Sequence, residues 1–297
     1  VLSLEKLTEL NRSHLDHYMV EGDTSMYNFA ATINEIFAVS DNEANNRLFE
    51  FLGSDYINSK LKSKGIHPLR ISHRLSTSDA ANPNTKSIDL RSNGNNTLTI
   101  HSNTNNTPRP LKLNHLNKGI GYIQDGLPIG TPFDFSYKNY FSLNAQHEMI
   151  KRVIFPEAFE ASERFLISEE KRNFLLESMH KLPREQGYDP KTYYDSYGKF
   201  LWFGDTKKQL PKHIKIYNKV GYAYGTLTDC AFIEDRKNNL SYFVTATILV
   251  NQNGIFNDNN YEYDSIGIPF LAELGRQIHK YEKYRKKHLR TSISKGQ

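Results

Sequence analysis

Two short groups of residues have side chains suited to acid–base chemistry. Ser40-Asp41-Asn42 places a hydroxyl, a carboxylate and an amide in a row within the stretch IFAVSDNEANNRLFEFLG, residues 36–53. Lys219-Val220-Gly221 places an ammonium group on a strand-like segment far along the chain. Hydroxyl, carboxylate and ammonium groups are the ones that proteins use for proton transfer and nucleophilic attack. Each tripeptide is a weak signal alone, because tripeptides of common residues arise by chance.

Other chemical signals are incomplete. The chain has no GxxxxGK phosphate loop and no GxSxG elbow. His14 and His17 are three residues apart, but no third ligand is evident, so we expect no metal site and no cofactor. The eleven histidines give no nucleophile–base pair by spacing. Cys230 is the one cysteine, which excludes an internal disulfide and a cysteine-based metal site.

The first motif lies where a helical pattern is interrupted. Ser, Asp and Asn are poor helix-interior residues because they hydrogen-bond their own backbone. Ser40-Asp41-Asn42 therefore predicts a polar elbow between two helices. Residues 1 to about 70 are predicted to be helical, with breaks at residues 21–23, at residues 39–42 and at Gly65.

The second motif lies among strand signals. Helical periodicity covers residues 145–159 and 168–182, where Ser168 is the expected N-cap. Three strand-like runs follow at residues 213–225, 227–235 and 240–251, and RKNN between the last two indicates an antiparallel hairpin. Residues 268–287 predict a long final helix.

Between these regions lies a polar insert, residues 76 to about 135. Its first part, residues 76–107, is rich in Asn, Ser and Thr, and a Gly- and Pro-rich stretch follows at residues 119–132. Most of it is predicted to be surface loop, although the alternating piece TLTIH (residues 97–101) could form a hairpin.

Composition indicates a soluble globular protein. Hydrophobic residues make up 38% of the 297 residues, charged residues 24%, and the net charge is +5. No run of about 18 apolar residues exists, so we expect no membrane-spanning segment. The basic and aromatic tail at residues 280–295 is the one stretch that fits a nucleic-acid surface. We favour a solvated helix end there and expect no nucleic-acid partner.

The two motifs, in this order and setting, resemble two of the three signature elements of the serine β-lactamase and penicillin-binding protein superfamily: S-x-x-K, then SDN, then K-T/S-G. The resemblance implies an α/β (α+β) fold in which a helical lobe packs against an antiparallel sheet flanked by terminal helices. It implies one domain over residues 1–297, incomplete at its N-terminus. The helical lobe would cover about 1–200, including the insert, and the sheet with the C-terminal helix about 212–290.

The resemblance also implies a serine hydrolase that forms an acyl-enzyme on a β-lactam, peptide or ester. Ser40 and Lys219 would be catalytic, relaying a proton to the leaving nitrogen in a groove between lobe and sheet. Asn42 would orient the substrate. Gly221 would line the substrate site, and the backbone N–H of Tyr222 would donate to the oxyanion. The partner would be a small molecule or cell-wall peptide, and the location periplasmic or otherwise extracytoplasmic in a bacterium.

The S-x-x-K element departs from this pattern. Only Ser3-Leu4-Glu5-Lys6 precedes SDN, and it lies closer to SDN than the family spacing. The start VLSLEKLTEL looks like the later turns of the nucleophile's helix. We therefore favour a nucleophile before Val1, with Ser3 and Lys6 as the alternative within the chain.

Three further departures concern the substrate. Val220 stands where the family has Thr or Ser, which removes a hydroxyl that contacts the substrate carboxylate. Asp229 falls near the place of a carboxylate-binding Arg, where we expect it to repel an anion. Residues 71–83 (ISHRLSTSDAANP) contain no Glu to act as the deacylation base. Without this base an acyl-enzyme would persist, which favours a penicillin-binding-like acyltransferase or slow esterase over an efficient β-lactamase.

Two alternatives remain open. A catalytically idle descendant would use the groove only to bind cell-wall peptide or glycan. An unrelated α/β binding protein would use SDN only as a helix N-cap.

Overall fold

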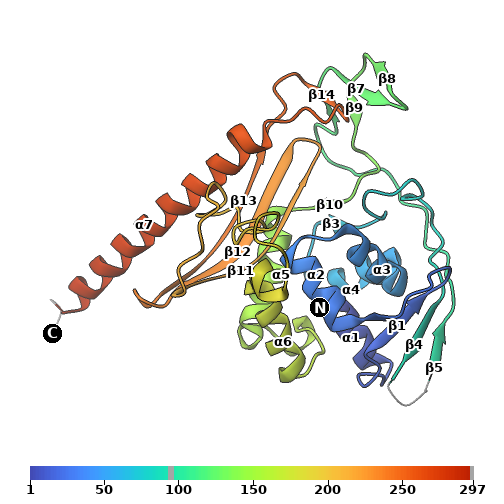
Figure 1. Ribbon diagram of the computed structural model, residues 1–297, viewed down its shortest axis with the longest axis horizontal. Coiled ribbons are helices and arrows are strands. Elements are labelled where there is room, and N and C mark those ends of the chain that lie inside the picture. Colours follow the sequence, from blue (N-terminus) through green and yellow to red (C-terminus); the bar gives the residue numbers. More distant parts are fainter. Residues whose placement is uncertain (93–96, 295–297) are drawn as a thin grey trace. The chain divides into compact units, whose positions relative to one another are not determined.

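The computed structural model describes residues 1–92 and 97–294 of a mixed α/β chain (Figure 1). Residues 93–96, in the predicted insert, and 295–297, at the end of the basic tail, lie outside the described residues. The chain divides into two compact units. The first unit comprises Val1–Asn117 and Asp134–Ser178, and the second comprises Lys118–Phe133 and the chain from Met179 onward.

Helices of the first unit begin at side chains that accept hydrogen bonds from the first turn. Asn28, Asp41 and Ser142 each accept from the backbone N–H three residues on, which stabilises a helix start. Ser168 does the same for the helix that the sequence predicts after it. The helices are α1 Leu2–Glu9, α2 Phe29–Ala38, α3 Asn42–Leu52, α4 Ser54–Ser63, α5 Leu143–Ile154 and α6 Glu169–His180, the end of which enters the second unit.

A four-stranded antiparallel sheet lies in the first unit, in the order β2-β1-β4-β5. Its strands are β1 His17–Val20, β2 Tyr27–Asn28, β4 Ile88–Arg91 and β5 Thr97–Ile100. The prediction of helix throughout residues 1–70 is wrong here, because Tyr18 and Val20 pack with Ile88 and Leu90 in one apolar cluster. The hairpin considered for TLTIH is confirmed by the pairing of β4 with β5.

Short strands complete the description. In the first unit β3 Leu69–Arg70 pairs with β10 Tyr140–Phe141. In the second unit β14 Ile255–Phe256, β7 Gly121–Gln124 and β8 Leu127–Ile129 form a small sheet. A two-stranded pair joins β6 Asn117–Lys118 and β9 Phe133–Asp134.

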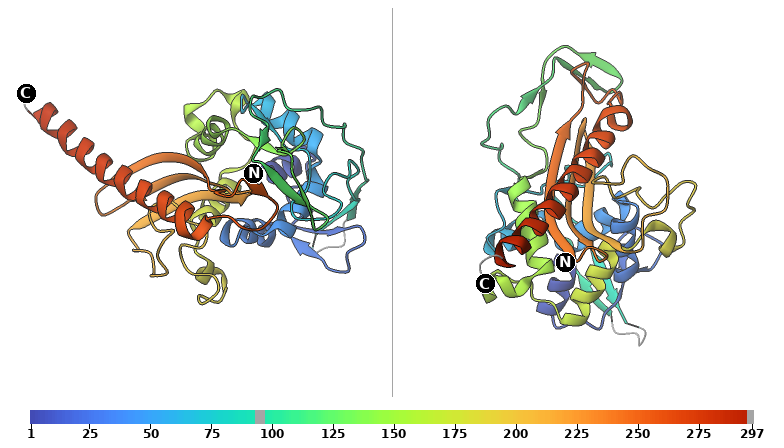
Figure 2. Two further views of the ribbon diagram at one scale, coloured as in Figure 1. Left: turned by 90° about the horizontal axis from the view of Figure 1, so that it is seen from above. Right: turned by 90° about the vertical axis from the view of Figure 1, so that its left-hand side faces the viewer.

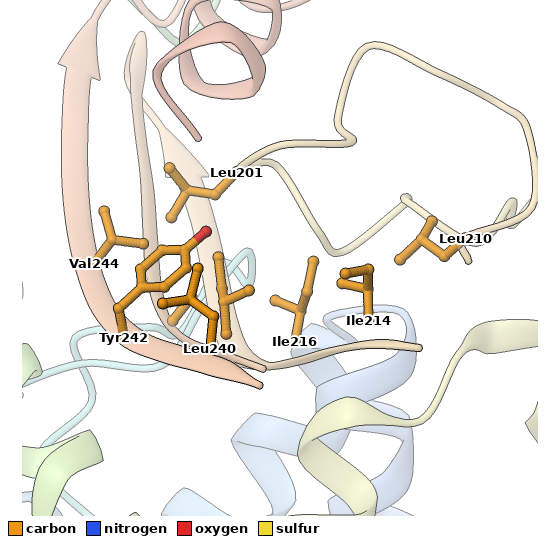
Figure 3. Close-up of a cluster of buried hydrophobic side chains, with 9 residues drawn as sticks. Leu201, Leu210, Ile214, Ile216, Leu240, Tyr242 and Val244 are labelled. Atoms are coloured by element: carbon orange, nitrogen blue, oxygen red, sulfur yellow. The ribbon is translucent and has the colours of Figure 1, made fainter. Parts of the chain in front are cut away.

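The second unit is built on the three predicted strands, which are confirmed as β11 Ile214–Ala223, β12 Thr226–Asp235 and β13 Leu240–Leu249. They form an antiparallel sheet in that order, so β11 is an outer strand. The predicted final helix is α7, Ile268–Ser294, which packs on β13 (Figures 1 and 2). Apolar side chains from the sheet and from the segment before it form the core (Figure 3): Leu201, Leu210, Ile214, Ile216, Leu240, Tyr242 and Val244.

A two-residue turn connects β11 to β12. Tyr224 and Gly225 both have positive φ, 52° and 76°, as a type I′ hairpin turn requires. Ala223 pairs with Thr226 across the turn. A side chain at Gly225 would meet the carbonyl oxygen of Val250 at 2.6 Å, so this position requires glycine for space as well as for φ.

We predict that Gly225→Ala lowers the free energy of unfolding by at least twice as much as Gly187→Ala. Both glycines have positive φ, 76° and 84°, which costs an alanine about 1 kcal/mol. At Gly225 an added Cβ would also clash with the carbonyl oxygen of Val250, whereas a Cβ at Gly187 would meet no described atom within 4 Å. Urea denaturation of the two variants measures the difference, and equal losses would contradict the steric argument.

Candidate functional site

The polar elbow predicted from the sequence is present between α2 and α3. Ser40 adopts a left-handed backbone conformation with φ 56°, which is uncommon and unfavourable for a residue other than glycine. Asp41 follows as the N-cap of α3, and its Oδ1 accepts from the N–H of Ala44 at 2.7 Å. Asp41 therefore has a structural role, while Ser40 and Asn42 on either side are left for other contacts. Unfavourable backbone of this kind is enriched at functional sites.

Asn42 contacts a residue that the sequence did not indicate. Its Nδ2 donates to the hydroxyl oxygen of Ser76 at 3.0 Å. Ser76 also has a positive φ, 50°. The neighbouring Leu75 is fixed by Asn46, whose side chain donates to its carbonyl and accepts from its N–H, both at 2.8 Å. Ser76 lies within residues 71–83, the segment in which the resemblance places the deacylation base.

A buried ion pair holds the segment that carries Ser76. Arg74 donates through two nitrogens to the two carboxylate oxygens of Glu50, and both residues are buried. Arg74 also donates to the carbonyls of Asn82 and Asn84, at 2.8 and 2.7 Å. Glu50 accepts from the N–H of Lys86 at 2.8 Å. Bidentate Arg–carboxylate pairs fix geometry as well as charge, so Ser76 is presented by an ordered loop.

One face of β11 packs into the core, and the opposite face is more exposed. Val220 is 8% exposed and packs in an apolar cluster with Phe200, Leu227, Val250 and Leu271. Successive side chains on a strand point to opposite faces, so Lys219 and Gly221 share the face opposite to Val220. A Cβ at Gly221 would meet no described atom within 4 Å. The strand thus leaves room beside Lys219 on that face.

Lys219 is half-buried, and its Nζ donates to the carbonyl of Val220 at 2.6 Å. Burial lowers the pKa of Lys219 to about 8, against the opposing charge of Asp229. Desolvation disfavours the charged form of an amine. The ammonium group is therefore poised to lose its proton in the mildly alkaline range.

The backbone of β11 is aligned by the hairpin turn. Ala223 and Thr226 flank a two-residue turn, so their backbone N–H and C=O groups bond to each other. In an antiparallel pair the bonded residues alternate with residues whose backbone N–H and C=O groups point away from the partner strand. Counting back from Ala223, every second residue of β11 therefore points these groups away from β12. The carbonyls of Ile216 and Val220 show this, since they accept from Lys199 and Lys219. By the same alternation, the N–H of Tyr222 points to the open edge of the sheet.

A buried polar network lies beneath Lys219. Lys199 donates to Asn218 Oδ1 at 2.6 Å and to the carbonyls of Met179 and Ile216 at 2.8 and 3.0 Å. Asn218 Nδ2 donates to Asp229 Oδ1 at 2.8 Å. Burial lowers the pKa of Lys199 and raises that of Asp229, and the charge of each opposes the shift of the other.

The expectation that Asp229 faces and repels an anionic substrate is wrong. Asp229 is 0% exposed. Its second oxygen accepts from the N–H of Leu201 at 3.0 Å, so both oxygens are used inside the second unit. The register places Asp229 opposite Val220, on the core side of the sheet.

Ser3 and Lys6, the alternative nucleophile pair, lie on α1. Ser3 is 2% exposed, and the Nζ of Lys6 donates to the carbonyl of Phe51. Burial lowers the pKa of Lys6 to about 8, with Glu9 opposing the shift. Neither side chain presents its polar group to solvent in the way that a nucleophile and its base require.

The structure thus gives two separate groups of candidate residues. Ser40, Asn42 and the additional Ser76 belong to the first unit. Lys219, Gly221 and Tyr222 follow one another on β11 in the second unit. The joint action of the two groups stays a prediction.

Within residues 1–92 and 97–294, no three His, Cys, Asp or Glu side chains gather as a metal site would need. None of the described helices combines the length and the apolar character needed to cross a bilayer.

Comparisons with known proteins agree with the fold prediction. Residues 11–107 match the model of the β-lactamase enzyme family. The fold is similar to that of the chromosome-encoded β-lactamase of Vibrio parahaemolyticus, at 12% identity and a TM-score of 0.51, over 94% of this chain and 80% of that one. A class A β-lactamase from Mycobacterium abscessus is similar at 11% identity and a TM-score of 0.51, over 94% and 80%.

A further similar structure is a mutant of PBP-A described as an acyl-enzyme complex with penicillin G. It has 13% identity and a TM-score of 0.51, over 94% of this chain and 78% of that one. A search of curated proteins gives no match. The predicted β-lactamase/transpeptidase-like fold is confirmed.

We predict that Lys199→Met destabilises the protein by about 3–5 kcal/mol, because it leaves the buried carboxylate of Asp229 without its compensating charge. The double variant Lys199→Met/Asp229→Asn should lose at least 1 kcal/mol less than the sum of the two single variants, since the charges interact. Urea denaturation measures all three. Lys191→Met, at an exposed lysine, is the matched control and should have no effect. Additive losses would show that the network does not act as a unit.

Proposed function

We propose that this chain, which has the β-lactamase/transpeptidase-like fold and matches the β-lactamase family model over residues 11–107, is a serine hydrolase that forms an acyl-enzyme on a β-lactam, peptide or ester. The observation that carries the proposal is the arrangement on β11. Lys219 and Gly221 share one open face, and the N–H of Tyr222 points to the free edge of an outer strand. An ammonium group and a directed N–H in this arrangement suit an anionic substrate and a developing oxyanion.

In the proposed reaction a serine hydroxyl attacks the acyl carbon. By the resemblance, the nucleophile is the serine of an S-x-x-K element. A C–O bond forms, the C–N or C–O bond of the substrate breaks, and the serine proton passes through Ser40 and Lys219 to the leaving atom. The N–H of Tyr222 donates to the carbonyl oxygen as it gains negative charge, and Asn42 orients the substrate. Water then hydrolyses the ester, or another nucleophile takes the acyl group.

The segment around Ser76 bears on the fate of the acyl-enzyme. Residues 71–83 contain no Glu, and the side chain that they place beside Asn42 is the Ser76 hydroxyl. A serine hydroxyl is a far weaker base than a glutamate, so water activation is slow. We therefore propose a long-lived acyl-enzyme, as in a penicillin-binding-like acyltransferase or slow esterase. By the same resemblance we propose an extracytoplasmic location and a cell-wall peptide or small molecule as substrate.

The second candidate function is a catalytically idle protein that binds cell-wall peptide or glycan. The position of Val220 inside an apolar cluster favours it, because no hydroxyl is available there for a substrate carboxylate. The burial of Asp229 removes one of the reasons for proposing an idle protein, because the buried carboxylate is not placed to repel an anionic substrate.

We predict that Ser40→Ala and Lys219→Ala each slow covalent labelling of the full-length protein by a penicillin-type probe by about a hundredfold or more. Intact-mass spectrometry measures the adduct over time. Ser59→Ala and Lys62→Ala are the matched controls, because these exposed residues form another S-x-x-K pattern, and they should label normally. Normal labelling of both site variants would exclude the roles proposed for Ser40 and Lys219. Absence of any adduct in the unaltered protein, with β-lactams and esters alike, would favour the idle protein.

We predict that acylation by an anionic substrate weakens as the pH rises through about 8. The lowered pKa of Lys219 means that its ammonium is charged below this pH and neutral above it, so the attraction for a substrate carboxylate is lost on the alkaline side. The second-order acylation rate constant, measured against pH, checks this. Lys219→Arg should abolish the decline because arginine stays charged. A profile that is flat from pH 7 to 9 in the unaltered protein would contradict the assignment.

A further inference from the structure

Basic side chains gather at one end of the β11–β13 sheet. They come from the start of β11, from the turn between β12 and β13 and from the second half of α7. The hydrogen bond from the N–H of Arg236 to the carbonyl of His213, at 2.9 Å, joins the first two segments. The bond from Lys286 Nζ to the carbonyl of Asn238, at 3.1 Å, joins the helix to the turn. We name this surface the basic end: Lys212, Lys215, Arg236, Lys237, Lys280, Lys283, Arg285, Lys286 and Lys287.

The excess positive charge of the chain is concentrated at the basic end. Its nine cations face three acidic residues of the same segments, Glu234, Asp235 and Glu282, which leaves six positive charges. The whole chain has a net charge of +5. Asp235 is buried and is engaged by Asn238 and His279, so it screens the surface little. A field of one sign at one end of a protein attracts a partner of the opposite sign.

Exposed aromatic rings lie beside these cations on α7. Tyr281 and Tyr284 are each 61% exposed, and residues three apart share one face of a helix. Lys280, Lys283 and Lys287 form a neighbouring row at spacings of three and four, and all three are exposed. A row of tyrosines beside a row of lysines is typical of a helix that lies at a membrane surface, where the rings sit at the level of the headgroups.

The last part of α7 projects from the sheet of the second unit. Figures 1 and 2 show the last turns of α7 standing clear of the strands of its own unit. Proteins that bind single-stranded nucleic acid without sequence preference use a positively charged groove that follows the backbone. A projecting helix with lysine as its main cation suits a flat anionic surface better.

We propose that the basic end, with Tyr281 and Tyr284, docks this protein on an anionic lipid surface. The proposal does not rest on hydrolase activity. Tyr222 lies about 25 Å along β11 from the basic end, at 3.3 Å per residue. Docking therefore leaves Tyr222 away from the lipid contact.

Flotation of the full-length protein with vesicles tests the proposal. We expect binding to vesicles of phosphatidylcholine and phosphatidylglycerol in equal parts, and none to phosphatidylcholine alone. In the triple variant Lys280→Gln/Lys283→Gln/Lys287→Gln, binding should fall about a hundredfold, because each basic residue near such a surface contributes about a fivefold change in affinity. The control Lys112→Gln/Lys118→Gln/Lys208→Gln removes the same charge at exposed lysines elsewhere and should bind normally.

Salt separates the contribution of the charges from that of the rings. Raising the salt from about 0.1 M to about 1 M shortens the screening length from about 10 Å to about 3 Å and should weaken binding without abolishing it. Tyr281→Ser/Tyr284→Ser should weaken binding at both salt concentrations, because ring insertion is not screened. Unaltered binding of the lysine triple variant, equal loss in the control, or tighter binding to DNA than to the anionic vesicles at the same salt would each overturn the proposal.

Discussion

A network of buried charged and polar side chains beneath β11 holds the exposed residues of that strand in position. Lys199, Asn218 and Asp229 are nearly inaccessible and bond to one another and to backbone carbonyls and N–H groups. An unpaired charge in such a place costs several kcal/mol, so the strand cannot slide without breaking the network. Because Asn218 precedes Lys219 directly, the network sets the position of the ammonium group. The edge carbonyl of Ile216 is held by the same lysine.

The first unit follows the same rule. Each exposed candidate residue is the direct neighbour of a residue that is fixed by its hydrogen bonds. Asp41 caps α3 beside Asn42, and the backbone of Leu75 is held by Asn46 beside Ser76. Short polar side chains would otherwise be mobile in solvent. Their arrangement is therefore set by the hydrogen bonds of the neighbouring residues.

Local signals in the sequence predicted the elements that depend on local physics. The strand-like runs and the RKNN turn indicated β12 and β13, and the short polar residues at Ser40-Asp41-Asn42 indicated the break between α2 and α3. Partners distant in the chain could not be predicted in this way. Tyr18 packs with Leu90, and Asp229 meets the backbone of Leu201. The charge of Asp229 suggested exposure, because nothing in its own neighbourhood reveals a buried donor. The contact of Ser76 with Asn42 could not be predicted, because the left-handed backbone of Ser76 has no sequence signal.

The clamp made by Arg74 has a consequence for how this protein can vary. The guanidinium of Arg74 binds Glu50 on α3 and the carbonyls of Asn82 and Asn84, eight and ten residues after Arg74. These bonds close the chain from Arg74 to Asn84 into a loop, much as a covalent crosslink would. Residues 77–81, beyond Ser76 at the tip of that loop, are not buried in the core, so their number and identity can change while both ends stay in place. The tip is accordingly a natural position for inserted peptides, tags or lineage-specific extensions.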